Sequence, residues 1–365
     1  MVKFIALGGF LGAGKTTIMI AAAEQLRAAG RSVVVIANDQ GLDLIDTAMA
    51  GRKVQGAGEV TTGCFCCRFN DLVDVTRRLV EQEGADTVIA ESVGSCTDLT
   101  ATVIRPLLQL YGNEFELAPL TTVVDPVRYG RFEARWATGE PDTDLGYLYR
   151  KQLQDGDIIA INKIDLLEPP EVERVIEAIR ARFPHAEVVT LAAAHGELGA
   201  LRHAWGSDYV DRGTDLDIDY GRYGVAESKL AWLNRTFDVR PLNGPYDPTV
   251  WARAALDSIA EACRREGYIV GHVKVMVTGA DGQFVKASLV DETRHVSVDE
   301  SSGSFSSAAI ATLNARVQCE PAEMDNMSDI AVATADLVAH SKSVADCGTS
   351  FKPGQPVPVH RLRSA

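Results

Sequence analysis

Short apolar runs alternate with amphipathic stretches over residues 1–205 of the chain. The apolar runs are rich in β-branched residues and predict buried strands over Val2–Leu7, Ser32–Ala37, Thr87–Ala90, Leu120–Val124, Asp157–Ile161 and Glu187–Thr190. The stretches between them have helical periodicity and predict helices that include Thr16–Ala29, Asp71–Glu83 and Glu171–Arg182. Because continuous apolar strands separated by helices are typical of βαβ units, we expect an α/β fold with a mostly parallel sheet covered on both faces.

The pattern changes after residues 206–224, a polar stretch rich in Asp and Gly. We therefore expect a first domain over 1–205, a linker over 206–227, a smaller second domain over 228–345 and a flexible, proline-containing tail over 346–365. In the second domain, the predicted strands are Lys229–Val239, Gly271–Thr278, Gln283–Val290 and Ala311–Cys319. The predicted helices are Pro248–Glu266 and Asp329–Ala339, the latter with Ser328 as its N-cap. These elements predict an α+β domain with mostly antiparallel strands.

Composition and charge narrow the classes of function. The 365 residues are 46% hydrophobic and 24% charged, which is ordinary for a globular protein, and the formal net charge is −14. A negative field of this size repels phosphate backbones, so we expect no nucleic-acid partner and no membrane partner. No run reaches the ~18 apolar residues that a membrane span needs. The seven cysteines, three of them within four residues, do not suit a disulfide framework and predict a reducing, cytoplasmic location.

Residues Gly9–Thr16 fit the pattern G-x-x-x-x-G-K-[ST] and lie between a predicted strand and a predicted helix. In such a loop, backbone N–H groups surround the phosphates, the lysine bridges the β- and γ-phosphates, and the Thr hydroxyl binds Mg²⁺. The expected nucleotide-binding residues are Gly9, Gly12, Ala13, Gly14, Lys15, Thr16 (also on Mg²⁺) and Thr17. The alternatives are a ligand-free turn and a dinucleotide site, and the latter is disfavoured because Thr17 stands where its third glycine belongs.

A second nucleotide motif, Asn162-Lys163-Ile164-Asp165, follows the predicted strand Asp157–Ile161 at the carboxyl edge of the sheet. In N-K-x-D, the Asp carboxylate accepts hydrogen bonds from guanine N1–H and the 2-amino group, while the Asn contacts the N7/O6 side. Adenine lacks the 2-amino group, so ATP would leave a polar group unpaired. The backbone near Ala193 is a further candidate for the guanine pocket. The alternative is a helix N-terminus capped by Asp165, but the two motifs together predict a GTP site.

Acidic residues follow two predicted strands that end beside the phosphate loop. Asp39, in Asn38-Asp39-Gln40-Gly41, follows one of these strands and Glu91 follows the next. Carboxylates in this position orient Mg²⁺ or the attacking water, because phosphoryl transfer depends on positioning and charge neutralisation. We therefore expect Lys15, Asp39 and Glu91 to act in catalysis, with Asp39 on Mg²⁺ directly or through water. The alternative for either acid is a solvated loop residue.

Cys64, Cys66 and Cys67 form a dense thiol motif beside Gly63. A free Cys is usually an inert small residue of a core, but three together without apolar periodicity do not suit a core. Their spacing suits a soft or borderline ion, Zn²⁺ first, with Co²⁺ or Ni²⁺ as alternatives. Three ligands leave a fourth position open, which favours a transferable metal over a permanent structural one. Cys96 is either a further ligand or a small loop residue.

Four elements together resemble one known family: Gly8–Thr17, Gly63–Cys67, Glu91–Gly94 and Asn162–Asp165. Their order and spacing are similar to those of the CobW-type GTPases, which are related to UreG and HypB. The resemblance implies a GTP-hydrolysing metallochaperone or cofactor-maturation factor, in which the thiolate motif holds the metal between nucleotide-sensing elements. The chain departs from the family at 38–41, where Asn-Glu-Phe-Gly is usual, and in its seven scattered histidines, where a His-rich stretch is common.

The motifs and the resemblance predict a slow, Mg²⁺-dependent GTPase that couples its Cys-x-Cys-Cys metal site to the nucleotide state. Its partner would be a client metalloenzyme or cofactor-dependent enzyme, and one Zn²⁺ or Co²⁺ is expected per chain or per homodimer. The alternative is a GTPase chaperone that gates or reactivates a corrinoid-dependent enzyme, with the cysteines holding a structural zinc. A phosphotransferase with the same loop would not need the motif at 162–165, which counts against that class.

Overall fold

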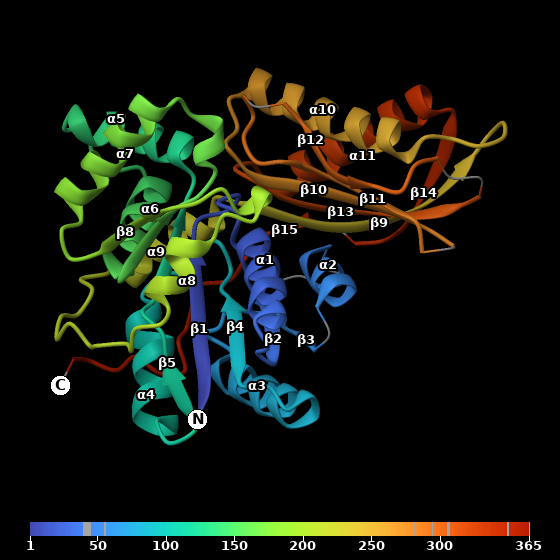
Figure 1. Ribbon diagram of the computed structural model, residues 1–365. Helices are drawn as coiled ribbons and strands as arrows, with labels where there is room; N and C mark the ends of the chain where they lie inside the picture. The colour runs from blue at the N-terminus through green and yellow to red at the C-terminus, as the bar shows by residue number, and fades with distance from the viewer. Residues whose placement is uncertain are drawn as a thin grey trace. The chain divides into compact units, whose positions relative to one another are not determined.

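The computed structural model describes residues 1–38, 45–54, 56–280, 282–293, 295–304, 307–348 and 350–364, without the side chains of 46–48. Within these residues the chain forms two compact units (Figure 1). The first contains 1–38, 46–226 and 355–364, and the second contains residue 45 and 227–354. The last described residues of the first unit therefore follow the whole second unit in the sequence.

The first unit is built on an eight-stranded sheet in which every pairing between described strands is parallel. The spatial order is β3-β2-β4-β1-β6-β7-β8, and β5 pairs with β1. Figure 1 shows the neighbours β1, β4, β2 and β3 in this sequence. The strands are β1 (Val2–Gly9), β2 (Val33–Asn38), β3 (Ala57–Val60), β4 (Thr87–Glu91), β5 (Phe115–Leu117), β6 (Thr121–Val124), β7 (Ile158–Ile161) and β8 (Glu187–Thr190). β2, β4, β6 and β7 are buried along their whole length, as strands between two helical layers are. The expected parallel α/β sheet is confirmed.

Helices connect these strands and cover the sheet. They are α1 (Lys15–Ala28), α2 (Ile45–Lys53), α3 (Phe69–Glu83), α4 (Arg105–Tyr111), α5 (Pro126–Ala137), α6 (Asp144–Asp155), α7 (Pro169–Arg182), α8 (Gly199–Ala204) and α9 (Tyr220–Ser228), with a π-helical turn at Thr100–Ile104 and 3₁₀ turns at Ile164–Leu166 and Ala193–His195. Ile18, Met19 and Ala22 of α1 share one core with Leu7 and Val35 of the sheet. This packing fixes the start of α1 at the carboxyl end of β1, which positions the phosphate loop between them.

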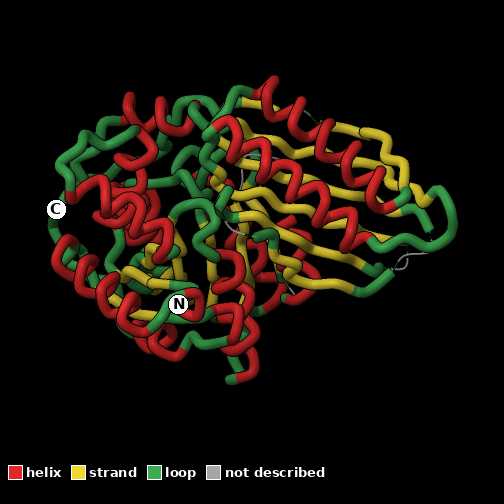
Figure 2. Tube along the Cα trace, turned by 90° about the horizontal axis from the view of Figure 1, so that it is seen from above, coloured by secondary structure: helices red, strands yellow, loops and turns green. Residues whose placement is uncertain are grey.

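The second unit is an antiparallel sheet with two long helices on one face. The strand order is β12-β11-β10-β13-β9-β14, with β15 on β9. The elements are β9 (Ala231–Pro241), α10 (Pro248–Glu266), β10 (Val270–Gly279), β11 (Phe284–Leu289), β12 (Ser297–Ser301), β13 (Ala309–Val317), α11 (Pro321–Ala339), β14 (Ser341–Cys347) and β15 (Ser350–Phe351). Helices α10 and α11 lie side by side (Figure 2), and Trp251 and Ile259 share a core with Val273 and Val275. The expected antiparallel α+β domain is confirmed.

Helix α11 begins earlier than the sequence pattern predicts. It starts at Pro321, and the Glu323 carboxylate accepts a hydrogen bond from the backbone N–H of Glu320 (2.8 Å). A proline at the first helical position loses no hydrogen bond, and the carboxylate satisfies a donor at the helix start. Ser328 is a buried residue inside the helix, so its prediction as the N-cap is wrong. No described helix, α10 and α11 included, is long and apolar enough to cross a membrane.

Segments expected to be a linker and a flexible tail are fastened to the first unit. The buried guanidinium of Arg105 pairs with Asp211 (2.7 Å) and Asp215 (2.6 Å) of the expected linker. It also donates to the backbone carbonyl of Leu362 in the expected tail (3.1 Å). A buried cation needs such partners, because an unpaired one is costly. Residues 206–219 and 355–364 are therefore structural parts of the first unit, while 341–347 and 350–351 are strands of the second.

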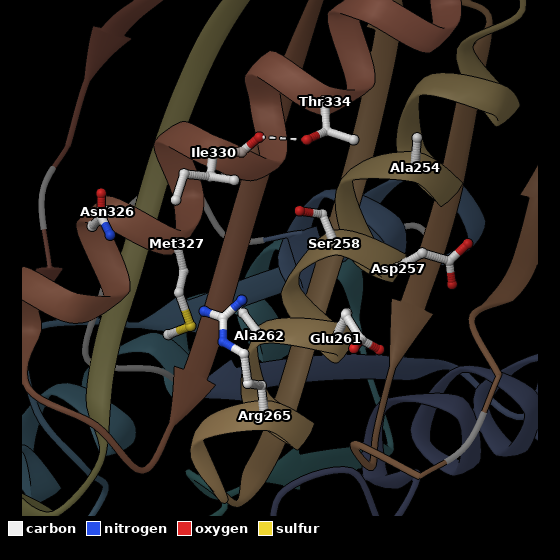
Figure 3. A pocket seen from close by; sticks show the side chains of 10 residues that line it. All are labelled: Ala254, Asp257, Ser258, Glu261, Ala262, Arg265, Asn326, Met327, Ile330 and Thr334. Carbon is white, nitrogen blue, oxygen red and sulfur yellow. Dashed lines mark hydrogen bonds between the residues drawn. The ribbon is translucent and has the colours of Figure 1, made fainter.

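The seam between α10 and α11 holds a cavity of about 360 Å³ (Figure 3). Its lining includes Arg265, Met327 and Ile330, together with Thr334, whose hydroxyl donates to the backbone carbonyl of Ile330 (2.8 Å). Every lining residue belongs to the second unit, and none is a nucleotide or metal residue expected from the sequence.

Candidate functional site

The phosphate loop turns sharply between β1 and α1. Gly9, Gly12 and Gly14 have φ angles of 125°, 75° and 99°, a region that favours glycine. A Cβ on Gly14 would lie 2.3 Å from Nδ2 of Asn162, so the close approach of these two segments also requires glycine. The Lys15 ammonium donates to the carbonyl of Gly9 (2.8 Å). This contact holds the lysine over the loop, where the motif binds the β- and γ-phosphates.

Thr16 and Glu91 meet at the carboxyl ends of the neighbouring strands β1 and β4. The Thr16 hydroxyl lies 3.0 Å from each carboxylate oxygen of Glu91, which is buried. A Cβ on Gly94 would lie 2.9 Å from the backbone N of Leu11, so the segment after β4 lies against the phosphate loop. The structure thus brings together two residues expected at the catalytic centre. Asp39, the other expected acid, lies outside the described residues.

The side chain of Asn162 braces the nucleotide site. It is 2% exposed, its Nδ2 donates to the carbonyl of Ala13 (3.0 Å), and its Oδ1 accepts from the N–H of Ala193 (3.1 Å). These bonds tie the phosphate loop to the segment after β8, a role that the sequence analysis did not assign. The Asp165 side chain is 31% exposed and lies 3.6 Å from the His195 ring. Asp165 is thus open to solvent, whereas Asn162 is not.

Lys163 reaches across the same loop. Its ammonium donates to the carbonyl of Gly12 (2.6 Å) and to the carboxylate of Asp125 (3.0 Å). Asp125 is buried and caps α5, since its side chain accepts hydrogen bonds from the first N–H groups of that helix. Thr17, the remaining expected residue, is exposed in the first turn of α1. The described residues that were expected to bind nucleotide therefore gather at one edge of the parallel sheet.

The clustered cysteines converge in a turn between β3 and α3. The Sγ atoms of Cys64 and Cys66 are 2.7 Å apart, those of Cys64 and Cys67 3.3 Å, and those of Cys66 and Cys67 3.7 Å. The N–H groups of Cys67 and Arg68 donate to the carbonyl of Cys64 (3.0 and 2.9 Å), which closes a helical turn. Three sulfurs within 4.8 Å of one another fit the donor set of a single thiophilic metal ion.

Without a cation these thiols hold their protons. Hydrogen bonds with Cys64 and Cys67 raise the pKa of Cys66 well above its usual value, and burial raises it further. The hydrogen bond with Cys64 raises the pKa of Cys67 to about 11. Because metal ligation requires thiolates, a metal that binds here must displace these protons.

Cys96 lies close to the cluster. It is fully buried after β4, and interaction with its thiol raises the pKa of Cys64 and of Cys66. The side-chain amide of Gln152 donates to the carbonyls of Gly94 (2.9 Å) and Cys96 (2.8 Å), which fixes this segment against α6. The structure therefore brings together Cys64, Cys66 and Cys67, while Cys96 lies beside them and outside the set of sulfurs within 4.8 Å of one another.

Asn38, the last residue of β2, joins the cysteine turn to the segment after β4. Its Nδ2 donates to the carbonyls of Val60 and Gly63 (both 2.8 Å). Its Oδ1 accepts from the N–H groups of Phe65 (2.9 Å) and Val93 (3.4 Å). The sequence analysis considered Asn38 only as the first residue of an acidic motif. The available signal was a polar side chain at the end of an otherwise apolar strand.

Val357 is a second residue that sequence reasoning missed. Its backbone N–H donates to Sγ of Cys67 (3.3 Å), and the N–H of Val359 donates to the carbonyl of Cys66 (2.8 Å). The contacts join parts of the chain that are 290 residues apart. No local pattern in the proline-containing segment indicates such partners.

These features define the class of the first unit. A strand–loop–helix phosphate site, a guanine-type N-K-x-D motif and a thiol cluster share one parallel sheet. The segment after β4 contacts both the phosphate loop and the cysteines. The first unit is a P-loop nucleotide-binding domain with an adjoining candidate metal centre.

The chain belongs to the family described as CobW/HypB/UreG, nucleotide-binding domain, whose sequence pattern matches residues 3–190. It is 30% identical over 218 residues to the zinc chaperone CobW of Pseudomonas aeruginosa and 28% identical over 221 residues to that of Sinorhizobium sp.. These matches cover 52% and 53% of this chain but only 56% and 59% of the two relatives. The expected family is confirmed.

Among solved structures, the zinc-bound YjiA GTPase from E. coli is similar over 92% of this chain and 98% of its own, with 14% identity and a TM-score of 0.38.

Proposed function

We propose that the protein is a GTP-binding and GTP-hydrolysing metallochaperone, in which the nucleotide state sets how tightly a Cys-bound metal ion is held. One observation carries the proposal. Glu91, the last residue of β4, contacts Thr16 of the phosphate motif, and Cys96, five residues later, interacts with the thiols of Cys64 and Cys66. A displacement of Glu91 on nucleotide binding would therefore be passed to the metal site. The recipient would be a cytoplasmic metalloenzyme or cofactor-dependent enzyme.

At the nucleotide site, Lys15 would neutralise the β- and γ-phosphates, and Thr16 would ligate Mg²⁺. The Thr16 hydroxyl now bonds to Glu91, so a cation bound by Thr16 would change that contact. Glu91 would then hold a water of the Mg²⁺ shell or the attacking water. Asp39 is the second acid that we propose for this task. The partly exposed carboxylate of Asp165 would select guanine over adenine.

The metal would be the cargo rather than a resident cofactor. Thiol donors favour Zn²⁺ first, with Co²⁺ and Ni²⁺ as alternatives, and two relatives carry the name zinc chaperone. Cys64, Cys66 and Cys67 would supply three ligands. Cys96 would occupy the fourth position in the holding state and leave it when its segment moves, which would open the site to a ligand from the client.

The test compares metal affinity in two nucleotide states. Competition with a chromophoric chelator measures Zn²⁺ affinity with a non-hydrolysable GTP analogue and with GDP. Linkage makes the effect of nucleotide on metal equal to that of metal on nucleotide, and a coupling of about 1–3 kcal/mol predicts a ~5- to 150-fold difference. Equal affinities in both states would contradict the proposal.

Cysteine variants provide the controls for this experiment. The double variant Cys66→Ser/Cys67→Ser should lose Zn²⁺ and still bind GTP. Cys347→Ser removes an exposed thiol of the second unit and should change neither Zn²⁺ affinity nor GTP affinity. If Cys347→Ser also lost Zn²⁺, metal binding would not be specific to the cysteine cluster.

A second candidate function is favoured by the burial of the thiols. Cys64, Cys66 and Cys96 are at most 2% exposed, as the ligands of a permanent zinc often are. The protein would then be a GTPase chaperone that gates or reactivates a corrinoid-dependent enzyme. A metal that chelators remove only when the protein unfolds would support this alternative.

A further inference from the structure

Residues 355–364 lie against the turn that carries the thiols. The N–H of Val357 donates to Sγ of Cys67 (3.3 Å), and the N–H of Val359 donates to the carbonyl of Cys66 (2.8 Å). The segment follows β15 of the second unit but belongs to the first (Figure 1). It therefore contacts a candidate metal ligand directly, although it lies far from the motif in sequence.

Two prolines restrict the segment to these contacts. Pro356 and Pro358 flank Val357, and proline has no N–H and a fixed φ. The residue before a proline is confined to extended conformations. The backbone N–H groups of Val357 and Val359 are therefore the donors that residues 356–359 offer, and both point at cysteines. The Val357 side chain is 74% exposed, so this residue contributes its N–H rather than packing.

An ion pair between a partly exposed arginine and a buried carboxylate anchors the segment just beyond. Arg361 Nε donates to the carboxylate of Asp98 (2.7 Å), which is fully buried and also accepts from the hydroxyl of Tyr220 (2.7 Å). The N–H of Leu362 donates to the carbonyl of Ala101 (2.9 Å). A buried carboxylate that loses its cation is costly, so this pair favours the docked segment. Asp98 follows Cys96 by two residues, so the anchor and the fourth thiol share one loop.

We propose that residues 355–364 form a clasp on the metal site, in which the N–H of Val357 donates to the metal-bound Cys67 thiolate and the docked segment slows release of the metal. The inference rests on the proposed function, because it concerns the same thiols. Hydrogen bonds to a ligating group orient it and tune its donor strength, and bonds to a charged acceptor are the strong ones. Val357 acts through Cys67 and is a positioning residue.

The first test removes a single N–H. Val357→Pro deletes the donor at a residue that the following proline already confines to extended conformations, while Val357→Ala keeps the donor and loses only an exposed side chain. Co²⁺ is the probe, because its thiolate charge-transfer absorption reports on the ligands and its loss to excess EDTA gives a dissociation rate. We expect Val357→Pro to shift the absorption to lower energy. It should also release Co²⁺ about ten- to a hundredfold faster, the factor for one hydrogen bond to a charged group.

The second test loosens the anchor without touching the thiols. Arg361→Gln removes the partner of Asp98, and Arg363→Gln removes the same charge from an exposed position of the same segment. We expect faster Co²⁺ release only in Arg361→Gln, with the charge-transfer absorption unchanged in both. Thermal unfolding of each variant confirms that it folds.

The outcomes separate the clasp from the proposed function. Co²⁺ binding with equal release rates in Val357→Pro and Val357→Ala, and in Arg361→Gln and Arg363→Gln, would overturn the clasp and leave the metallochaperone intact. An unmodified protein that binds no Co²⁺ or Zn²⁺ would overturn both.

Discussion

Replacing Asn38 with alanine should uncouple the metal site from the nucleotide site. The side chain makes four hydrogen bonds, three of 2.8–2.9 Å and one of 3.4 Å. Those to Val60, Gly63 and Phe65 hold the cysteine turn, and the longest, from Val93, reaches the segment between Glu91 and Cys96. In the variant, the cysteine turn and the segment after β4 would stay in place, but no side chain would hydrogen-bond to both of them.

The magnitude follows from the bonds that are lost. Each intramolecular hydrogen bond contributes about 1 kcal/mol net, and a buried N–H left without a partner costs about 1–3 kcal/mol. The two short bonds from Nδ2, at about 1 kcal/mol each, and the orphaned N–H of Phe65, at about 1–3 kcal/mol, therefore predict a loss of about 3–5 kcal/mol in unfolding free energy. Gln152→Ala is the matched control. It removes two buried hydrogen bonds that the side-chain amide donates to the segment after β4 and none to the cysteine turn, at a cost of about 2 kcal/mol.

Two assays check this prediction. Urea titration gives the unfolding free energy of the first unit, whose unfolding transition is identified by the loss of GTP binding. Zn²⁺ affinity with the GTP analogue and with GDP gives the coupling between the sites. We expect both variants to lose stability, with the nucleotide effect on Zn²⁺ affinity reduced in Asn38→Ala and kept in Gln152→Ala. If Asn38→Ala kept the full nucleotide effect, the reasoning that routes coupling through this side chain would be refuted.

Two further predictions concern the base pocket and a buried acid. Asp165→Asn should shift preference from GTP towards xanthosine triphosphate, whose 2-oxo group needs a donor; calorimetric titration decides this, and comparable GTP and ATP affinities in the unmodified protein would contradict the guanine site. Burial raises the pKa of Asp155 to about 7, so the folded state keeps a proton that the unfolded chain loses near pH 4. The unfolding free energy should therefore fall as pH rises from about 4 to about 7, by at most about 4 kcal/mol. Asp155→Asn keeps an acceptor for the N–H of Leu99 and should flatten this dependence in urea titrations; a slope equal to that of the unmodified protein would exclude Asp155 as its source.

Elements whose own residues form a clear pattern could be predicted from the sequence. Strand β7 is apolar throughout and strand β2 is apolar up to Asn38, and both were expected. Helix α10 has the bounds that the sequence predicts, because Pro248 opens it after the cap Asp247 and Gly267 ends it with a left-handed conformation. The phosphate loop and the thiol motif were likewise visible, since each is one continuous run of residues.

Features that depend on distant partners could not be predicted in this way. Strand β3 contains Gly58 and Glu59 and forms because β2 offers it a parallel neighbour. Asn38 and Val357 join the site through contacts made only in the folded chain. A sequence pattern describes what a residue prefers locally, so it carries no information on such partners.

The return of residues 355–364 to the first unit sets an order of events during synthesis. Cys67 leaves the ribosome with the amino-terminal part of the parallel sheet, but Val357 follows 290 residues later. At roughly 5–20 residues per second, this interval lasts about 15–60 s. The thiols are therefore made long before the segment that contacts them, and a nascent or prematurely terminated chain presents an unclasped site. Only chains that have been translated beyond the second unit would then retain the metal stably.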